Sequence, residues 1–345
     1  MTNSDVPLAS PQASSLAAAI EGLILGAWVS QAITAVAELG VADALTGGPL
    51  PIDDLAAAVG ADPDALYRLL RALISQGIFA RRPDGRYELT PLAEPLRSDT
   101  PMSLTAVARF VGSREHREHW SLLTEAIRTG RSVIPTLRGK SFFDYLGDNP
   151  EFGRIFDDAM TSWSEVATGP VIDAYDFTPY RTIVDVAGGH GRLLAAILAS
   201  SPTTQGVLYD LPHVIAGATP LLQEKRVAER VRLVGGSFFD EIPTGGDAYI
   251  LKHIIHDWND DAALEILRNV RTAAATGARL LLIERIIPED DGESRCKWVD
   301  MEMLLISGRE RTVSEYRRLL DGAGFQMIRV VETASSLNVI EAHAT

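Results

Sequence analysis

The sequence predicts an α/β fold in which a helical N-terminal half is followed by a doubly wound parallel sheet. After residue 181, short apolar runs alternate with polar turns and helical segments, the pattern of a parallel sheet covered by helices on both faces. Before residue 181, apolar residues recur mostly at helical spacing, with one hairpin signal among them. The length of 345 residues is sufficient for two domains.

Composition narrows the class of protein. The 46 acidic and 32 basic residues give a net charge of −14, which argues against a protein that grips phosphate backbones. The single cysteine, Cys296, cannot form an intrachain disulfide or a CxxC metal site, which favours a reducing compartment. No Lys or Arg precedes Arg68, so the positively charged region of a secretory signal is missing. We therefore expect a cytoplasmic enzyme.

The chain is expected to begin with a loose polar tail, residues 1–12, and then a long helical segment, residues 13–45. Apolar side chains surround much of this helix: Ile20, Leu23, Leu25, Trp28 and Ile33. Such a helix needs a partner on more than one side, either a second copy of the chain or the interior of its own chain. Its uncharged stretch, residues 22–37, is shorter than the ~20 apolar residues that span a bilayer, so we expect no membrane contact.

Residues 51–97 have the pattern of a winged helix. Two helices, Ile52–Val59 and Ala65–Gln76, are followed by a hairpin signal around Pro83-Asp84-Gly85. A winged helix suggests DNA binding, but six arginines against seven acidic residues leave no basic face. We therefore interpret residues 13–100 as a dimerisation domain, with a DNA-binding regulator as the alternative.

Residues 101–180 form a further helical region that is rich in aromatic side chains. Most of these belong to an ordinary core, and a few are expected to line an apolar pocket for a flat substrate. His116 and His119, within a run of charged residues, are expected on a solvated helix face.

Residues 181–345 are predicted to form the sheet. The expected parallel strands are Thr182–Val186, Gly206–Asp210, Arg230–Val234, Asp247–Lys252 and Ala278–Ile283, and a final hairpin is expected from Phe325–Val331 and Ser336–Ala344. The first strand runs into a glycine turn that ends at Gly191, where a ligand can approach the backbone. Leu194 stands where a dinucleotide fingerprint has its third glycine, which favours a nucleoside ligand without phosphates.

Two acidic residues lie near this turn. Asp210 ends the second strand, 19 residues after Gly191, where a carboxylate accepts hydrogen bonds from both hydroxyls of a ribose; the alternative is a helix N-cap. Asp185 either binds an ammonium group or anchors the glycine turn.

His256-Asp257-Trp258 follows the fourth strand, at the edge of the sheet where doubly wound folds bind ligands. Glu284 ends the next strand, and Glu310 lies in Gly308-Arg-Glu-Arg-Thr312, so two carboxylates can flank one imidazole. This arrangement suits a general base. No Cys/His cluster or HExxH motif is present, and we expect no metal.

Seven segments of the second half carry a family resemblance. They are residues 183–191, YDLPHV (209–214), GGSFFDEIP (235–243), ILKHIIHDWND (250–260), LLLIERIIP (280–288), DMEMLLISGRERT (300–312) and AGFQ (323–326). Together they resemble the class I S-adenosylmethionine-dependent small-molecule O-methyltransferases of the caffeate and acetylserotonin type, including bacterial enzymes of secondary metabolism. The likeness runs from about residue 14 to 343. It implies a Rossmann-like methyltransferase sheet, an N-terminal winged-helix dimerisation domain, a homodimer, and S-adenosyl-L-homocysteine as the cofactor product.

The resemblance also assigns roles to residues. It implies His256 as the base, oriented by Glu284 and Glu310. The implied cofactor residues are Ser164, Asp185, Gly188, Gly189, Gly191, Asp210, Leu211, Ser237, Phe238 and Lys252. The implied substrate residues are Met160, Trp163, Asp257, Met303 and Ile306, for most of which plain core packing is the alternative. Ala187 replaces a glycine, and Ser237 replaces the usual Asp that faces adenine.

The predicted reaction is in-line transfer of the sulfonium methyl to a hydroxyl, which we expect to be a phenol, on an aromatic small molecule. Some relatives use the same cofactor to support hydroxylation or decarboxylation of polycyclic substrates, which is the alternative activity. We expect neither nucleic acid nor membrane as a partner.

Overall fold

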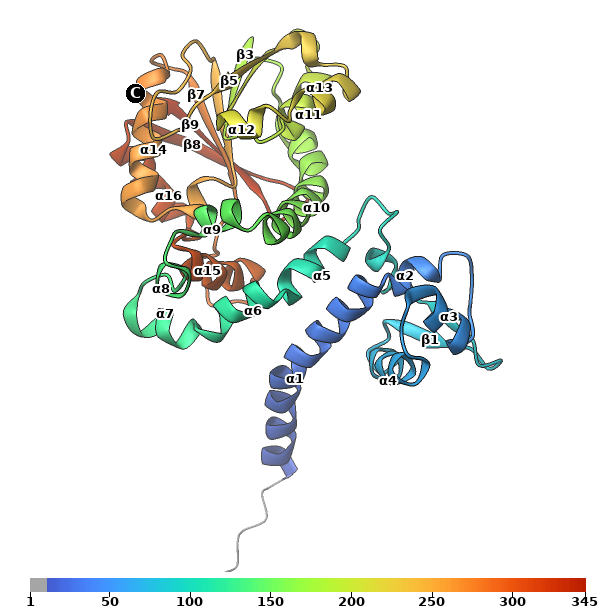
Figure 1. The fold of residues 1–345 in the computed structure, drawn as a ribbon. Coiled ribbons are helices and arrows are strands. Elements are labelled where there is room, and N and C mark those ends of the chain that lie inside the picture. The colour runs from blue at the N-terminus through green and yellow to red at the C-terminus, as the bar shows by residue number, and fades with distance from the viewer. Residues whose placement is uncertain (1–10) are drawn as a thin grey trace, which may run out of the picture. The chain divides into compact units, whose positions relative to one another are not determined.

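The computed structural model describes residues 11–345, so the predicted tail lies largely outside the described residues. The chain divides into two compact units. The first contains the chain up to Glu118 together with Asn149–Trp163, and the second contains His119–Asp148 and Ser164–Thr345. Figure 1 shows the elements of both units, which are described separately below.

The first unit begins with a long helix and a winged-helix motif. Its elements are α1 (Pro11–Leu39), α2 (Val41–Ala44), α3 (Ile52–Val59), α4 (Pro63–Ile74), β1 (Phe79–Arg81), β2 (Tyr87–Leu89) and η1 (Glu94–Leu96). The two predicted helices and the hairpin are confirmed, and Leu50 adds a bridge to Tyr87. The prediction of one helix up to residue 45 was wrong, because Gly40 adopts a left-handed conformation with φ of 68° and separates α1 from α2.

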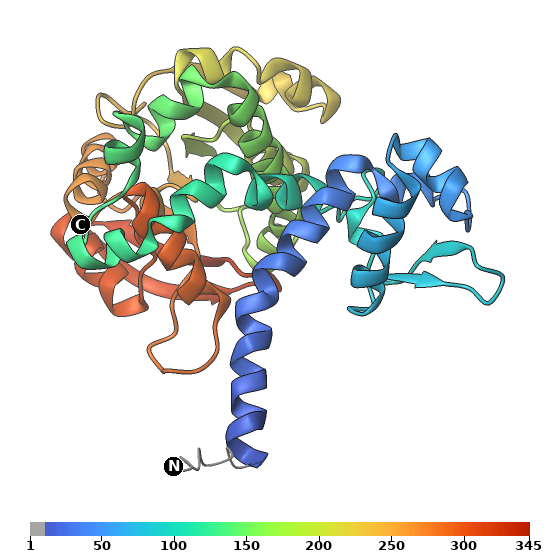
Figure 2. The same cartoon turned by 60° about the horizontal axis from the view of Figure 1, so that its bottom comes forward.

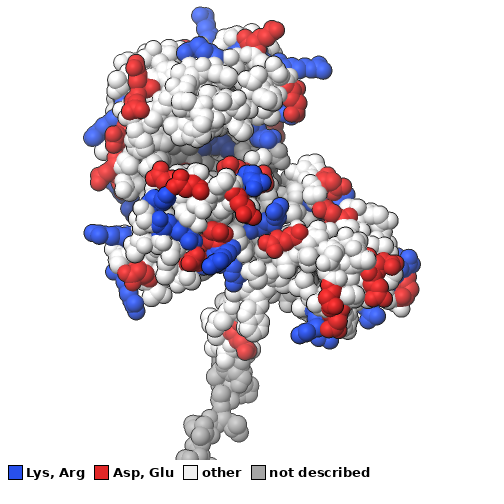
Figure 3. Space-filling model, in the orientation of Figure 1, with Lys and Arg blue, Asp and Glu red and all other residues white. Residues whose placement is uncertain are grey.

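Helix α1 leaves much of its apolar surface uncovered within the chain. Exposed side chains include Leu16, Ile20, Leu23, Ile24 and Trp28, and Figure 3 shows this helix almost free of charged atoms. Burial inside the chain, one of the two alternatives, therefore applies only to its C-terminal part. There Thr34 donates a 2.9 Å hydrogen bond to the Ala108 carbonyl on α5 (Thr105–Gly112). By length and composition alone, Ser15–Leu39 is long and apolar enough to cross a membrane, so the expectation that this segment is too short was wrong; the absence of a membrane partner stays a prediction.

The next stretch is helical as predicted, with α6 (Arg114–Ser121), α7 (Leu123–Thr129), α8 (Ile134–Arg138), α9 (Phe142–Asp148) and α10 (Pro150–Ala174). The prediction that His116 and His119 face solvent was wrong, since only 6% and 1% of their surfaces are exposed. The His116 ring lies 4.8 Å from that of Phe110, and the His119 ring lies 6.2 Å from that of Phe142. Aromatic neighbours on other helices contact these buried imidazoles despite their charged flanks.

The second unit contains a seven-stranded sheet in the order β5-β4-β3-β6-β7-β9-β8. Its strands are β3 (Thr182–Val186), β4 (Gln205–Asp210), β5 (Val231–Gly235), β6 (Ala248–Lys252), β7 (Arg279–Glu284), β8 (Phe325–Glu332) and β9 (Asn338–Ala344). The first five are parallel, and β9 is antiparallel to both β7 and β8. The predicted sheet and its closing hairpin are confirmed.

Helices cover both faces of this sheet, which defines a doubly wound fold (Figures 1 and 2). One core joins alternate strand residues such as Val184 and Leu251 to α14 (Asp260–Ala273) and α16 (Val313–Gly322). The other joins the intervening residues, such as Ile183 and Ile250, to helices on the opposite face. These are the C-terminal part of α10, α11 (Arg192–Ser200), α12 (Pro212–Ile215) and α13 (Thr219–Glu224).

The order of the strands also locates a ligand site. The chain builds outward from β3 to β4 and β5 on one side and from β6 to β7 on the other. Ligands of doubly wound folds bind beside the carboxyl ends of the strands at this reversal. The glycine turn follows β3, Asp210 ends β4, Lys252 ends β6 and Glu284 ends β7, so the predicted site residues gather at this edge.

Candidate active site

The glycine turn after β3 requires small residues. Gly189 and Gly191 have φ of 60° and 82°, and Ala187 has φ of 56°, a left-handed conformation unusual for a residue with a side chain. A Cβ on Gly188 would lie 2.5 Å from the Leu208 side chain and 2.6 Å from the Asp185 carboxyl. The turn therefore packs directly against side chains of β3 and β4.

Asp185 lies beneath this turn and is only 2% exposed. Its carboxyl hydrogen-bonds the backbone of Leu194 in α11, so it anchors the helix that the turn opens. Its second oxygen, Oδ2, is buried and has no hydrogen-bond partner among residues 11–345. Burial, opposed by the charge of Lys252, raises the pKa of Asp185 to about 7. This bond is made to α11 and not to the glycine turn, and it leaves one oxygen without a partner, so both interpretations of Asp185 stay predictions.

Lys252 and Ser164 meet beside Asp185. The Lys252 ammonium donates a 2.6 Å hydrogen bond to Ser164 Oγ from α10. Burial lowers the pKa of Lys252 to about 8, opposed by the charges of Asp185 and Glu284. An ammonium group, a hydroxyl and a buried carboxyl group are thereby held together at one end of this edge of the sheet.

Asp210 holds the other side of the glycine turn. Its carboxylate accepts hydrogen bonds of 2.7 Å from the backbone N–H groups of Gly189 and Leu211. Burial raises its pKa, and these bonds oppose the rise. The residue that caps α12 is Leu211, so the helix N-cap interpretation of Asp210 was wrong.

Three aromatic side chains, Phe238, Phe239 and Trp258, form a cluster after β5 and β6. Phe238, which is at a predicted adenine position, contacts Trp258 edge to face with ring centroids 5.8 Å apart, and Phe239 contacts the same indole at 4.8 Å. Ser237 turns the chain here, with its Oγ accepting from the Phe239 N–H at 3.2 Å. Sequence reasoning gave Trp258 no role, although it lies two residues after the predicted base.

His256 lies in the short helix η3 (Ile255–Asp257) and is only 7% exposed. Its Nδ1 is 2.9 Å from Glu310 Oε1, and its Nε2 is 3.4 Å from Asp257 Oδ1. Burial favours the neutral imidazole, but the carboxylates of Asp257, Glu284 and Glu310 outweigh it and raise the pKa of His256 to about 9. The ring is thus held at Nδ1, and Nε2 is its other basic atom.

Glu284 supports His256 through the backbone rather than by touching the ring. Its Oε1 accepts from the N–H groups of Ile254 and Ile255 at 3.0 Å and 2.9 Å. Burial, with the nearby carboxylates, raises the pKa of Glu284 to about 7. Of the two predicted carboxylates, Glu310 contacts the imidazole, and Glu284 fixes the loop that carries it.

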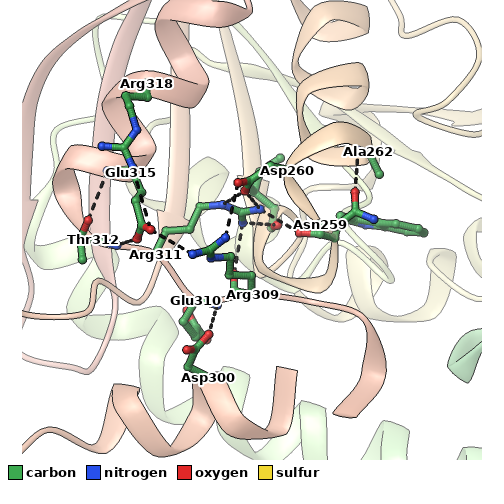
Figure 4. A network of polar contacts seen from close by, with 12 residues as sticks. Asn259, Asp260, Ala262, Asp300, Arg309, Glu310, Arg311, Thr312, Glu315 and Arg318 are labelled. Carbon is green, nitrogen blue, oxygen red and sulfur yellow. Dashed lines mark hydrogen bonds and ion pairs between the residues drawn. The ribbon is translucent and has the colours of Figure 1, made fainter. Parts of the chain in front are cut away.

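A buried arginine that sequence reasoning missed holds the same loop (Figure 4). Arg311 is 1% exposed, and its guanidinium donates to the carbonyls of Ile255 and Trp258 and to the Asp260 carboxylate, each at 2.8–3.0 Å. Beside it, a Cβ on Gly308 would overlap the carbonyl oxygen of His256. Both residues belong to the Gly308–Thr312 motif, so the motif itself was the available signal.

The predicted substrate residues fall in different units. Met160 and Trp163 belong to the first unit, where Trp163 meets Phe110 edge to face at 6.4 Å. Asp257, Met303 and Ile306 belong to the second, and Met303 is 7% exposed. Among the side chains that the structure describes, no group of three or more His, Cys, Asp or Glu residues is arranged to hold a metal ion.

Comparisons with known proteins agree with these elements. An O-methyltransferase domain model matches residues 120–326, and an O-methyltransferase dimerisation domain model matches residues 21–99. The chain is 40% identical to phenazine O-methyltransferase PhzM of Lysobacter antibioticus over 93% of this chain and 94% of that protein. It is 41% identical to 3-amino-4-hydroxybenzoate 4-O-methyltransferase of Streptomyces cremeus over 88% of this chain and 84% of that protein.

One solved structure adds ligands to the comparison. The O-methyltransferase NcsB1 from neocarzinostatin biosynthesis, in complex with S-adenosylmethionine and 2-hydroxy-5-methyl naphthoic acid, superposes with a TM-score of 0.79. It is 31% identical, with 92% of this chain and 96% of that chain covered. A further relative, 34% identical over 93% of this chain and 95% of that protein, is the phenazine-1-carboxylate N-methyltransferase of Pseudomonas aeruginosa.

Proposed function

This chain belongs to the S-adenosylmethionine-dependent O-methyltransferases of the bacterial secondary-metabolite type, and we propose that it methylates a phenolic hydroxyl of an aromatic small molecule with His256 as general base. The observation that carries this proposal is the pairing of His256 Nδ1 with the buried Glu310 carboxylate at 2.9 Å. This pairing fixes the ring and stabilises the imidazolium that forms when Nε2 takes a proton.

The residues at the sheet edge fit the cofactor. Asp185, through its unpartnered Oδ2, would receive the ammonium of the methionine end, and Lys252 with Ser164 would receive the carboxylate. Asp210 would bind the ribose, and the aromatic cluster at Phe238 would pack on adenine. When bound there, the cofactor supplies an electrophilic methyl group.

The chain's own contribution is to align and deprotonate the acceptor. Holding two reactants in a near-attack arrangement supplies roughly 7 to 11 kcal/mol of a barrier, and a positioned base adds about 10² to 10⁴ in rate. Asp257 lies 3.4 Å from Nε2, where it adjoins the acceptor oxygen, and we place Met303 and Ile306 along the acceptor ring. Met160 and Trp163 complete our proposed substrate set. The aromatic substrates in the relatives' names support an aromatic acceptor.

We also propose how the chain is organised around this reaction. Residues 13–100 form a homodimer, residues 101–180 cover the acceptor, and residues 181–345 bind the cofactor. The dimerisation-domain match and the exposed apolar side chains of α1 support the homodimer. On the face drawn in Figure 3, acidic and basic side chains are mixed with no basic stripe, which supports the absence of a nucleic-acid partner. We place the enzyme in the cytoplasm, without metal or membrane.

The test replaces the base and leaves the cofactor site intact. His256→Asn should bind S-adenosylmethionine like the parent in calorimetry and lose about 10² to 10⁴ in turnover of phenolic acceptors with a labelled methyl donor. His343→Asn is the matched control. His343 lies on β9 as the register partner of Arg279, the first residue of β7, whereas Glu284 is the last residue of that strand. Full turnover by His256→Asn would refute the assignment.

Product analysis separates the remaining chemistries. Mass spectrometry should show the gain of one methyl group in the product. NMR of the product, together with its stability to hydrolysis, should place this methyl group on oxygen rather than nitrogen. The N-methyltransferase relative makes this distinction necessary. A gain of oxygen or a loss of carboxyl without a methyl would instead establish cofactor-supported hydroxylation or decarboxylation.

A further inference from the structure

A second histidine, His253, lies beside the base in an unusual backbone conformation. It follows the last residue of β6 and has φ of 54°, a left-handed value that costs a residue with a side chain roughly 1 to 2 kcal/mol. Its N–H still donates to the Ile283 carbonyl on β7 at 3.1 Å. The bend at His253 thus turns the chain from the strand into η3, where His256 lies.

The bend also places the two imidazoles face to face. Their ring centroids are 5.1 Å apart, and their planes differ by 22°. His253 Nε2 is buried and finds no hydrogen-bond partner within the described part of the chain. Because this nitrogen makes no hydrogen bond within the described part of the chain, we attribute the position of the His253 ring to its stacking on His256.

The surroundings keep the His253 ring neutral. Burial lowers the pKa of His253 well below its usual value, and the positive charges of Arg285, His256 and Lys252 act in the same direction. A neutral ring against His256 adds no repulsion when His256 becomes a cation, whereas a second imidazolium would. The flat face of a neutral ring also remains compatible with the charged form of its neighbour.

We propose that His253 is a positioning residue for the base, whose ring packs on the face of the His256 imidazole and fixes its plane. Glu310 contacts the His256 ring at Nδ1, and Asp257 lies 3.4 Å from Nε2, so both carboxylates act at the ring nitrogens. The stacked His253 ring adds a contact on the ring face, which limits tilting of the ring, so that Nε2 keeps its direction toward the acceptor. The proposal rests on the proposed role of His256 as base.

Three variants of the full-length chain separate the ring from the backbone. His253→Phe keeps a flat ring and loses both nitrogens. His253→Asn loses the ring but tolerates the left-handed backbone better than most residues do. His253→Ala loses both advantages. If ring packing is the role, Phe should retain most of the parent kcat, whereas Asn and Ala should lose about tenfold or more, with the KM for S-adenosylmethionine unchanged.

Opposite patterns overturn the proposal. Asn more active than Phe would mean that the backbone conformation is what matters. Equal losses in Phe and Asn would assign the role to a nitrogen, and full activity in all three variants would leave no role. Melting curves for each variant show whether a loss of kcat is a loss of folding.

A readout independent of activity keeps the proposal apart from the role of His256. In histidine-labelled protein, NMR signals of the His256 ring protons, assigned by their disappearance in His256→Asn, report the ring current of a stacked neighbour. The shift should persist in His253→Phe and vanish in His253→Asn. A fully active His256→Asn enzyme would refute the base assignment while this measurement still tests the packing, and unchanged signals in His253→Asn would refute the packing itself.

Discussion

The pH dependence of the reaction should follow the charge on Glu310. This carboxylate is 1% exposed and lies 2.9 Å from His256 Nδ1, and with Asp257 and Glu284 it overcomes burial to raise the pKa of His256 to about 9. Relative to the usual value of 6.5, this rise corresponds to about 3 kcal/mol in favour of the imidazolium. At pH 7 His256 of the free enzyme is therefore mainly the imidazolium.

Glu310→Gln removes one charge but keeps an oxygen that accepts from Nδ1. An opposite charge this close is worth about 1 to 3 pH units, so the pKa of His256 should fall by that amount. The sign follows from the active form: kcat/KM rises with pH as His256 loses its proton, so the rising limb should move to lower pH in the variant. The plateau should also fall, because a less basic imidazole is a weaker proton acceptor.

The assay measures initial rates of labelled-methyl transfer to one acceptor at saturating S-adenosylmethionine, across about pH 6 to 10. The acceptor ionises identically for both enzymes, so a difference between the profiles belongs to the protein. Glu341→Gln is the matched control, because Glu341 is also buried and paired with arginines, but on β9. A rising limb that stays in place, or moves to higher pH, would refute the proposed electrostatic role of Glu310.

Three glycine or alanine exchanges test the packing. Gly308→Ala should reduce kcat by about tenfold or more, because the added methyl overlaps the His256 carbonyl and shifts the base; a normal kcat in steady-state assays would contradict this. Gly112→Ala should lower the free energy of unfolding by about 1 to 3 kcal/mol in chemical denaturation, because its methyl overlaps the Thr34 side chain. Adding Thr34→Ala to the same chain should recover part of this loss. No recovery would mean that the strain lies elsewhere. Ala187→Gly should raise the free energy of unfolding by roughly 1 kcal/mol or less by relieving a φ of 56°, and a lower melting temperature would count against that reasoning.

The fold class could be predicted from the sequence because each signal was local. Strand and helix periods alternate after residue 181, and the turn around Pro83-Asp84-Gly85 marks the hairpin. The break at Gly40 was missed because one glycine within an apolar helical pattern is usually tolerated. The burial of His116 and His119 was missed for a different reason: their aromatic partners, such as Phe142, come from other helices.

The site was predictable in its residues but not in their contacts. The position of His256 after a strand and of Glu310 in its motif predicted a pair that the structure brings to 2.9 Å. The period of the strand does not specify which oxygen of Glu284 meets which donor, so its bonds to the backbone of η3 were not foreseen. Arg311 was overlooked because a charged residue between polar neighbours is normally solvated.

Left-handed backbone conformations gather near the loop that carries His256. Among the described residues, four non-glycine residues have positive φ. Of these, Ala187 lies in the glycine turn, His253 lies three residues before His256, and Ser307 directly precedes Gly308. Such conformations persist only where surrounding contacts over-determine them. For the loop that carries His256, these contacts are those of Arg311 and Glu284 with the backbone of η3; at the glycine turn, the Ala187 N–H donates to the Tyr209 carbonyl. The loop that carries His256 is therefore held by the protein against its local preference, which is how three carboxylates remain gathered around one imidazole before an acceptor arrives.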